Sequence, residues 1–195
     1  MHDRLTELYE KIKVCEKCGL CKTAHNKVMG SGNTEAPLMI IGEAPGAEED
    51  RSGTPFVGKA GRFLDECLKE CGLDRKDVFI ANVMKCRPCI IEGRTNKNRP
   101  PTQEEIKACS PYLKEQIDII KPKIILPLGA PATKFVLGRK VLKMTEIRGI
   151  FYRTEFCEYV MPSLHPSYIL TYKGEAEKQM LISDIKKCAE IISKF

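Results

Sequence analysis

Ten of the 195 residues of this chain are cysteines, and half of these stand in two short segments. Cys15, Cys18 and Cys21 form a C-x-x-C-x-x-C run, and Cys86 and Cys89 have the same spacing further along the chain. Where thiols are kept reduced, such richness indicates metal or cluster ligation before disulfides. Four converging thiolates suit a zinc ion as well as an iron–sulfur cluster. The spacing therefore predicts a metal-bearing site of either kind.

Acidic, amide and imidazole side chains stand just past short apolar runs of the sequence. Runs of this length are typical of buried strands. In an open sheet of parallel strands, ligands bind beyond the carboxyl ends of the strands. We therefore expect Glu43, Asn82 and His165 to meet at one edge of a sheet. The apolar runs span residues 38–41, 78–81, 123–128 and 159–162.

Helical patterns alternate with these apolar runs and complete the predicted architecture. The segment that begins at Thr102 opens with a capping-box signature, in which Glu105 is the third residue after Thr102. The alternation predicts an α/β fold, a three-layer α/β/α sandwich with a central, mainly parallel four-stranded sheet. We expect residues 1–195 to form a single domain with an N-terminal helix and a Cys-rich segment. The predicted helices span residues 3–13, 60–71, 102–120, 131–137 and 175–194.

The composition is that of a globular protein, and the charge and the apolar runs indicate which kinds of partner to expect. Hydrophobic residues make up 43% of the chain, and 32 Lys and Arg against 26 Asp and Glu give a net charge of +6. This balance favours polyanionic partners without identifying one. No apolar run approaches the roughly 20 residues that span a bilayer, and residues 1–13 lack the apolar core of a signal peptide. We therefore expect a cytoplasmic protein with no membrane partner. We also expect a monomer, since nothing in the sequence requires a higher oligomeric state.

Three segments resemble, in order along the chain, those of the family 4 (iron–sulfur) uracil-DNA glycosylases. They are Gly42-Glu43-Ala44-Pro45-Gly46, Asn82-Val83-Met84-Lys85-Cys86-Arg87-Pro88 and His165-Pro166-Ser167. The resemblance implies a monofunctional DNA N-glycosylase of base excision repair. Such an enzyme flips deoxyuridine out of DNA, hydrolyses its N-glycosidic bond, releases uracil and leaves an abasic site. The implied partner is uracil-containing DNA.

The resemblance also implies a cofactor, one 4Fe-4S cluster with a structural role, and no nucleotide cofactor. Matched residue by residue, its ligands are Cys15, Cys18, Cys86 and Cys109. Cys21 and Cys89 are competitors, since each lies three residues from an implied ligand. Zinc remains the chemical alternative.

The catalytic residues implied by the resemblance are Glu43, Asn82 and His165. Asn82 would pair with uracil N3–H and O4, whereas cytosine presents the reverse pattern of donors and acceptors. His165 would donate a hydrogen bond to O2 of the departing uracil anion. Glu43 would orient the water or stabilise the positively charged sugar.

Other residues would bind the substrate without taking part in the chemistry. Phe56 would stack on the uracil face, and Glu49 would exclude the thymine methyl group. Backbone groups near Ala44, which stands where some relatives have Gly, would position uracil and water. Ser163 and Ser167 would contact phosphates.

If the resemblance holds, basic and apolar residues near these loops would contact DNA. Tyr168, Ile169 and Leu170 follow the His165 turn and could wedge into the duplex. Residues 89–97 look like an insertion relative to the family pattern. The basic residues expected to face DNA are Lys59, Arg62, Lys85, Arg87, Arg94, Lys97 and Arg99.

Two other classes of protein compete with the enzyme hypothesis. An iron–sulfur electron-transfer or cluster-carrier protein would explain the cysteines, and a nucleic-acid-binding module would explain the charge. Neither has a use for the combination of Glu43, Phe56, Asn82 and His165. Within the superfamily, a glycosylase for mismatches or for a broader set of deaminated bases is the nearest alternative.

Overall fold

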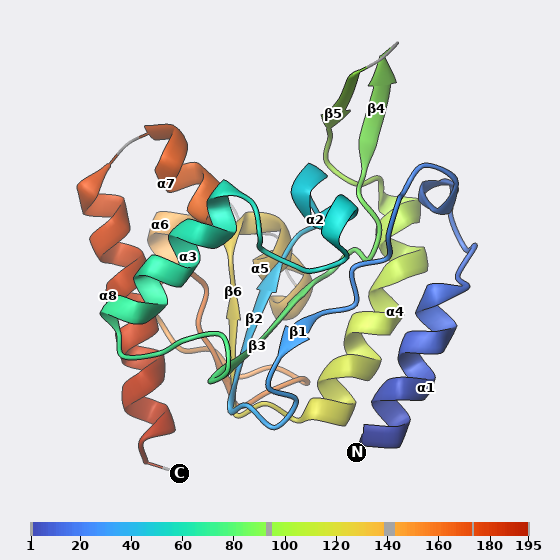
Figure 1. Cartoon of the computed structure of the whole chain (residues 1–195). Coiled ribbons are helices and arrows are strands. Elements are labelled where there is room, and N and C mark those ends of the chain that lie inside the picture. The colour runs from blue at the N-terminus through green and yellow to red at the C-terminus, as the bar shows by residue number, and fades with distance from the viewer. Residues whose placement is uncertain (1, 93–94, 139–142, 173, 195) are drawn as a thin grey trace.

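A mainly parallel sheet with the strand order β1-β3-β2-β6-β7 forms the centre of the computed structural model (Figure 1). The structure describes residues 2–92, 95–138, 143–172 and 174–194. The strand count is corrected from the predicted four to five. The additional strand β1 is two residues long and pairs antiparallel with β3 at the sheet edge, so it leaves no apolar run in the sequence. The parallel strands are the four predicted ones: β2 (Leu38–Gly42), β3 (Val78–Asn82), β6 (Ile124–Pro127) and β7 (Tyr159–Val160); β1 spans Ser31–Gly32.

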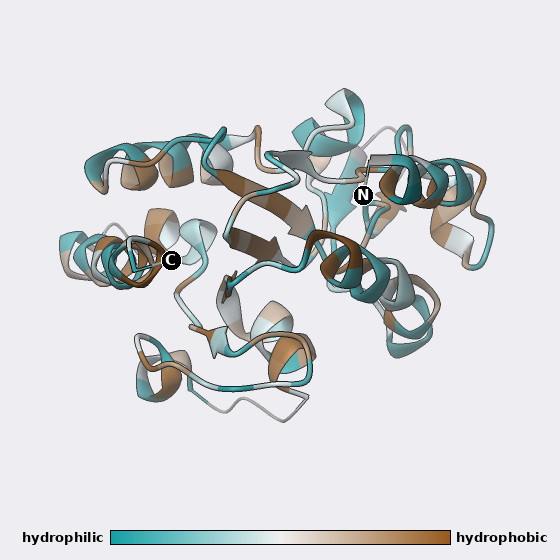
Figure 2. Ribbon diagram, turned by 90° about the horizontal axis from the view of Figure 1, so that it is seen from below, coloured by the Kyte–Doolittle hydropathy of each residue, from teal (hydrophilic) through white to brown (hydrophobic). Residues whose placement is uncertain are grey.

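Helices cover both faces of this sheet, because successive side chains of each strand point to opposite sides. In β2, Leu38 and Ile40 belong to one apolar core, and Met39 and Ile41 belong to another. Figure 2 shows the apolar strands between helices whose outer faces are hydrophilic. The predicted α/β fold with layers of helices on both sides is therefore confirmed. The first core is closed by α3 (Lys59–Glu70), α7 (Pro166–Tyr172) and α8 (Glu175–Ile192), and the second by α4 (Gln103–Ile120) and α5 (Gly129–Leu137).

A third core joins the N-terminal helix α1 (His2–Lys13) to α4. Leu5, Leu8 and Ile12 of α1 pack against Tyr112 of α4. The short 3₁₀ helix η1 (Gly19–Lys22) adds Leu20 to the same core. The Cys-rich segment after α1 therefore lies against α4 and the loop that follows β3.

The five predicted helices are present with boundaries shifted by a few residues. The capping box of α4 is formed, since Thr102 Oγ1 accepts the N–H of Glu105 at 3.2 Å and Glu105 Oε2 accepts the N–H of Thr102 at 2.7 Å. Three further helices, α2 (Ala47–Ser52), α6 (Met144–Ile147) and α7, are too short to produce a clear helical period. No helix in the described ranges is long and apolar enough to cross a membrane.

The segment that resembles an insertion forms a β-hairpin. Strands β4 (Cys89–Glu92) and β5 (Thr95–Asn98) pair antiparallel and project from the edge of the molecule at which the parallel strands end (Figure 1). Ile90 and Ile91 are 47% and 57% exposed on it. The hairpin therefore stands beside any site built at the carboxyl ends of the strands.

Candidate active site

A cleft of about 400 Å³ opens at the carboxyl ends of the parallel strands. Its walls come from the loops after β2, β3 and β7, as expected for parallel strands that end at the same edge. Residues far apart in the sequence therefore share one cleft. Six of the residues predicted to bind the substrate or catalyse the reaction line it, namely Ala44, Glu49, Phe56, Asn82, His165 and Ser167.

Asn82 ends β3 and is 2% exposed. Its side-chain oxygen Oδ1 is completely buried and has no hydrogen-bond partner among the described residues. Gly42, its neighbour in β2, permits this placement, because a Cβ there would lie 2.4 Å from Asn82 Oδ1 and 2.7 Å from the Phe56 ring. A buried acceptor without a partner is costly. Asn82 thus offers an unused acceptor to a ligand in the cleft.

Phe56 has a positive φ of 53°, which is strained for a residue with a side chain. Arg75 stabilises this conformation, since its Nη2 donates to the Phe56 carbonyl and its Nη1 to the Pro55 carbonyl at 3.1 Å. Asp65 in turn accepts from Nε of Arg75 at 2.7 Å. A Cβ on Gly61 would lie 1.7 Å from the Phe56 carbonyl oxygen, so only glycine fits there. The backbone of Phe56 is therefore fixed, and the residue lines the cleft.

His165 stands at the start of α7 with its imidazole against Phe56, at a centroid distance of 5.9 Å. The backbone N–H of Ser167 donates to His165 Nδ1 at 3.1 Å, and Ser167 Oγ lies 2.7 Å from the same nitrogen. Because a backbone N–H can only donate, Nδ1 must be the acceptor and the proton of the neutral ring lies on Nε2. Burial lowers the pKa of His165 to about 4, and the Glu49 carboxylate opposes this shift. At neutral pH the ring is therefore an uncharged Nε2–H donor.

Glu43 lies outside the cleft that contains Asn82. It lines an adjoining cavity of about 480 Å³, whose walls also include His165 and Ser167. Burial raises the pKa of the Glu43 carboxyl above its ordinary value. His165 therefore stands between Asn82 on one side and Glu43 on the other.

Glu49 lines the cleft with a carboxylate that is bound to backbone groups. Its Oε1 accepts the N–H groups of Val57 and Gly58 at 2.9 and 2.8 Å, and its Oε2 accepts the N–H of Gly46 at 3.1 Å. These bonds join the loop before α2 to the loop that carries Phe56. The position of Glu49 is consequently rigid.

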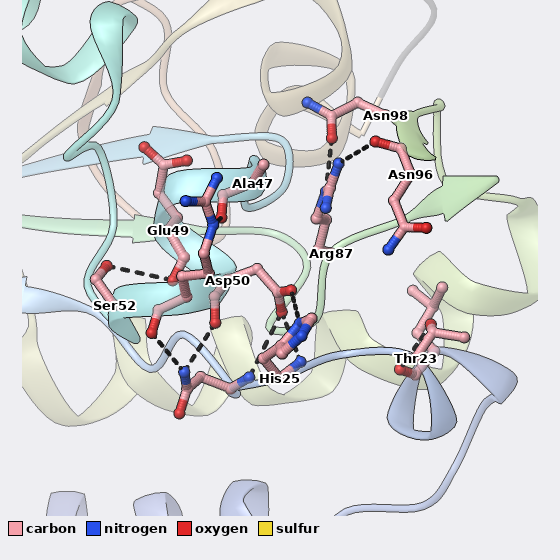
Figure 3. A network of polar contacts seen from close by, with 12 residues as sticks. Thr23, His25, Ala47, Glu49, Asp50, Ser52, Arg87, Asn96 and Asn98 are labelled. Atoms are coloured by element: carbon pink, nitrogen blue, oxygen red, sulfur yellow. Dashed lines mark hydrogen bonds and ion pairs between the residues drawn. The ribbon is translucent and has the colours of Figure 1, made fainter. Parts of the chain in front are cut away.

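A polar network anchors α2 to the Cys-rich segment (Figure 3). Asp50 is 2% exposed and accepts from His25 through the backbone N–H at 3.0 Å and the ring Nδ1 at 2.8 Å. Asn26 Nδ2 donates to the carbonyls of Asp50 and Arg51 at 2.8 and 2.9 Å. The helix that carries Glu49 is thus bound to the chain segment just after Cys21.

Asn98 is a cleft residue that the sequence analysis missed as a site residue. It belongs to β5, and its Oδ1 accepts from Nε of Arg87 at 2.7 Å (Figure 3). Arg87 Nη2 also donates to the carbonyl of Asn96 at 2.9 Å. The only signal for Asn98 was its place at the start of the Asn98-Arg99-Pro100-Pro101 segment, which alone implies no contact with the cleft.

Several residues expected to contact phosphates or DNA have partners inside the protein. Ser163 is completely buried and its hydroxyl donates to Asp184 at 2.6 Å, so it faces away from the cleft. Lys85 and Arg87 are 1% and 7% exposed and bind partners inside the protein. Arg99 is paired with Glu105 at 2.6 Å. Arg94 lies outside the described residues.

The remaining predicted contacts have more exposed positions. Lys59 lines the cleft, and Arg62 forms an ion pair with Glu48 at 3.2 Å. Tyr168 and Leu170 are 45% and 40% exposed on α7, whereas Ile169 is buried in the first core, because the helix turns its side chain inward.

The four cysteines implied as ligands come together between α1, the loop after β3 and α4. Cys15, Cys18, Cys86 and Cys109 line one cavity, and Cys21 reaches it as well. Burial raises the pKa of Cys86 to about 12, and the nearby thiols of Cys109, Cys18 and Cys15 act in the same direction. All ten cysteines are free, and within the described residues no group of three or more Cys, His, Asp or Glu side chains is arranged to hold a single metal ion.

Comparisons with known proteins show the family to which this chain belongs. The family model of the uracil DNA glycosylase superfamily matches residues 29–187. The chain therefore belongs to this superfamily. A type-4 uracil-DNA glycosylase of Thermotoga maritima is 40% identical over 95% of this chain and 93% of its own length, and one of Sulfurisphaera tokodaii is 43% identical over 97% and 85%. A type-5 uracil-DNA glycosylase of Thermus thermophilus is 28% identical over 80% of this chain and 75% of its own length. Within the superfamily, the chain is a member of the type-4 group.

Proposed function

We propose that the chain is a monofunctional uracil-DNA glycosylase that removes uracil from DNA and leaves an abasic site. The observation that carries this proposal is the buried, unpartnered Oδ1 of Asn82 at the cleft wall. Uracil N3–H is a donor that this acceptor could bind, whereas cytosine has an acceptor at N3. A cytosine in the cleft would leave Oδ1 unpaired, and a site of this kind rejects such a ligand strongly.

Stacking and exclusion would complete the selection of uracil. Phe56, whose backbone is fixed, would offer an aromatic face to the flipped base. We propose that Glu49 excludes thymine, because its carboxylate is held by three backbone N–H groups and cannot move aside for a methyl group. Ala44 would contact the base or the water through its backbone.

Cleavage of the N-glycosidic bond develops opposite charges on uracil and sugar, and residues around the cleft could stabilise each of them. Negative charge develops on the departing uracil, and the neutral Nε2–H of His165 is a donor for O2. Ser167 would fix the orientation of the His165 ring. Positive charge develops on the sugar, and the Glu43 carboxylate in the adjoining cavity would stabilise it and orient the attacking water.

DNA is the proposed partner, and the net charge of +6 favours its approach. Lys59 at the cleft would meet the backbone of the strand that carries the flipped nucleotide. Tyr168 and Leu170, exposed on α7 directly after the His165 turn, would occupy the gap in the base stack. We further propose that residues 1–195 act as a single glycosylase domain; the monomeric state and the cytoplasmic location remain predictions.

We propose that the cysteine site holds a 4Fe-4S cluster, with Cys15, Cys18, Cys86 and Cys109 as ligands. The donor set fits, because four thiols from three separated segments line one cavity. When bound, the cluster would tie the segment after α1 to the β3 loop and to α4. Cys21 lines the same cavity and is the competing ligand, whereas Cys89 does not line it.

Cleavage of a labelled oligonucleotide with one deoxyuridine, followed by alkali and a denaturing gel, tests the function. Strands with thymine, cytosine or hypoxanthine at the same position are run in parallel. Cleavage of the uracil strand alone supports the proposal. Cleavage of the hypoxanthine strand at the same rate would favour a broader glycosylase, and no cleavage at all would reject the enzyme.

Iron, acid-labile sulfide and zinc analysis tests the cofactor independently of activity. About four iron and four sulfide per chain are expected for one cluster, with a characteristic electron paramagnetic resonance signal after reduction. Cys109→Ala should lose the cluster, and Cys89→Ala is the matched control that should keep it. Zinc in place of iron would overturn the assignment.

A further inference from the structure

Lys85 lies between Asn82 and Cys86 in the loop after β3, and it is 1% exposed. Its Nζ donates to the backbone oxygen of Asn82 at 2.7 Å and to Oε1 of Gln116 at 2.6 Å. Its backbone N–H donates to Sγ of Cys109 at 3.2 Å. One residue therefore contacts both a proposed cluster ligand and the residue proposed to read uracil.

The charge of Lys85 is not balanced by a carboxylate within the described part of the chain. The two acceptors of its ammonium group are a backbone carbonyl and a side-chain amide, and both are neutral. A buried charge is costly unless an opposite charge compensates it. Lys85 itself lines the cysteine cavity, and the anionic groups nearest to it would be the thiolates of Cys109, whose Sγ accepts the backbone N–H of Lys85, and of Cys86, the next residue in the chain. A cluster held by four thiolates carries net negative charge and would supply the compensation.

The hydrogen bond from Lys85 Nζ to the Asn82 carbonyl affects the shape of the proposed uracil site. The Asn82 carbonyl lies at the last position of β3, where Gly42↔Asn82 is the final pair with β2. Nζ of Lys85 binds this carbonyl, so it holds the peptide from which the Asn82 amide reaches the cleft. Gln116 is fixed in turn, because its Nε2 donates to the Met29 carbonyl at 2.6 Å. Lys85 is consequently held on both sides.

We propose that Lys85 is a positioning residue that couples the cysteine-bound cluster to uracil recognition. The cluster balances the charge of its buried ammonium group, and this group fixes the backbone of Asn82 and with it the unpartnered Oδ1. The proposal rests on the proposed glycosylase function and on the cluster. It gives the cluster a task beyond joining α1 to α4, because loss of the cluster removes the charge that keeps Lys85 in place.

Lys85→Met tests the proposal, since it keeps the length of the side chain and removes the charge and the donors. In cluster-loaded protein, kcat on the uracil oligonucleotide should fall about 10- to 100-fold from misplacement of Asn82. KM for DNA should change less than about 3-fold, because Lys85 is buried and does not touch DNA. The reduction potential of the cluster should become more negative, because a nearby positive charge has been removed.

Lys114→Met is the matched control. It makes the same substitution on α4, the helix that carries Cys109, at a half-exposed side chain that pairs with Glu155 at 4.0 Å. Its cluster potential and kcat should both stay close to wild type. An unchanged potential in Lys85→Met, or wild-type kcat with a loaded cluster, would overturn the coupling.

The wild-type protein provides a second test that does not depend on the folding of a variant. Reduction changes the net charge of the cluster, and with it the compensation of the Lys85 charge that positions Asn82, so the oxidised and reduced protein should differ in uracil affinity. Coupling between two sites is reciprocal, so uracil bound at Asn82 must in turn shift the cluster potential. The potential is measured with and without free uracil, after equilibrium dialysis has shown that uracil is bound. A shift that is absent in Asn82→Ala supports the proposal, and an identical potential overturns it. Cleavage by wild type in the same preparation distinguishes a failure of this coupling from a failure of the glycosylase function.

Discussion

The rings of Phe56 and His165 are in direct contact in the cleft, with centroids 5.9 Å apart and planes inclined by 36°. Phe56 belongs to the loop between α2 and α3, and His165 to the loop before α7. The contact therefore joins the stacking surface to the proposed hydrogen-bond donor. A shift of either residue should displace the other.

Asn82→Ala should lower kcat/KM for uracil excision by about 100-fold or more, because it removes a preorganised hydrogen-bonding group. Its melting temperature should not fall, since Oδ1 of Asn82 has no partner to lose in the part of the chain that the structure describes. Gel-based kinetics and thermal melting measure the two quantities. Asn96→Ala, at an exposed position of the hairpin, is the control that should keep both. Unchanged excision by Asn82→Ala would remove this residue from base recognition.

His165 should stay neutral throughout the physiological range, because burial lowers its pKa to about 4. The folded-state pKa lies below the unfolded value, so this residue's contribution to stability is present above about pH 6.5 and is lost as the pH falls toward 4. Nitrogen-15 NMR should show one Nε2–H tautomer from pH 5 to 8. Ser167→Ala keeps the backbone N–H and should keep this tautomer, whereas His165→Ala should lower kcat about 100-fold. A midpoint near 6.5 would contradict the assignment.

Glu43 should set the acid side of the pH–rate profile. Burial raises its pKa, so the carboxylate becomes protonated at a higher pH than an ordinary glutamate and activity falls correspondingly early on acidification. Glu43→Gln should lower kcat and abolish this acid limb. Glu190→Gln on α8 should retain it. Persistence of the limb in Glu43→Gln would mean that another group is responsible.

Gly61→Ala should lower both the melting temperature and the uracil excision rate. A Cβ at this position would lie 1.7 Å from the Phe56 carbonyl, so the loop must move and the stacking surface moves with it. Gly19→Ala is the matched control, because the Cβ added there would have no neighbouring atom within 4 Å. Thermal melting and single-turnover kinetics of both variants separate the local clash from a general effect of replacing glycine.

Much of the fold could be predicted because it depends on local patterns. The apolar runs that form β2, β3, β6 and β7 are continuous in the sequence, and the capping box of α4 lies within four residues. Strand β1 carries no such pattern, since its two residues pair through backbone groups alone. The convergence of Asn82 and His165 was also predictable, because parallel strands end at the same edge.

The sequence by itself determined the fold class, the loops that build the cleft and the cysteines that share a cavity. Only the tertiary structure decided how individual side chains are used, because their partners lie far away along the chain. The side chain of Ser163 donates a hydrogen bond to Asp184, that of Lys85 donates to Asn82 and Gln116, and that of Arg87 donates to Asn98. From the sequence, each of these donor side chains was expected to contact phosphates or DNA at the surface. Burial requires an internal partner for each, and only the packed structure shows which partner that is.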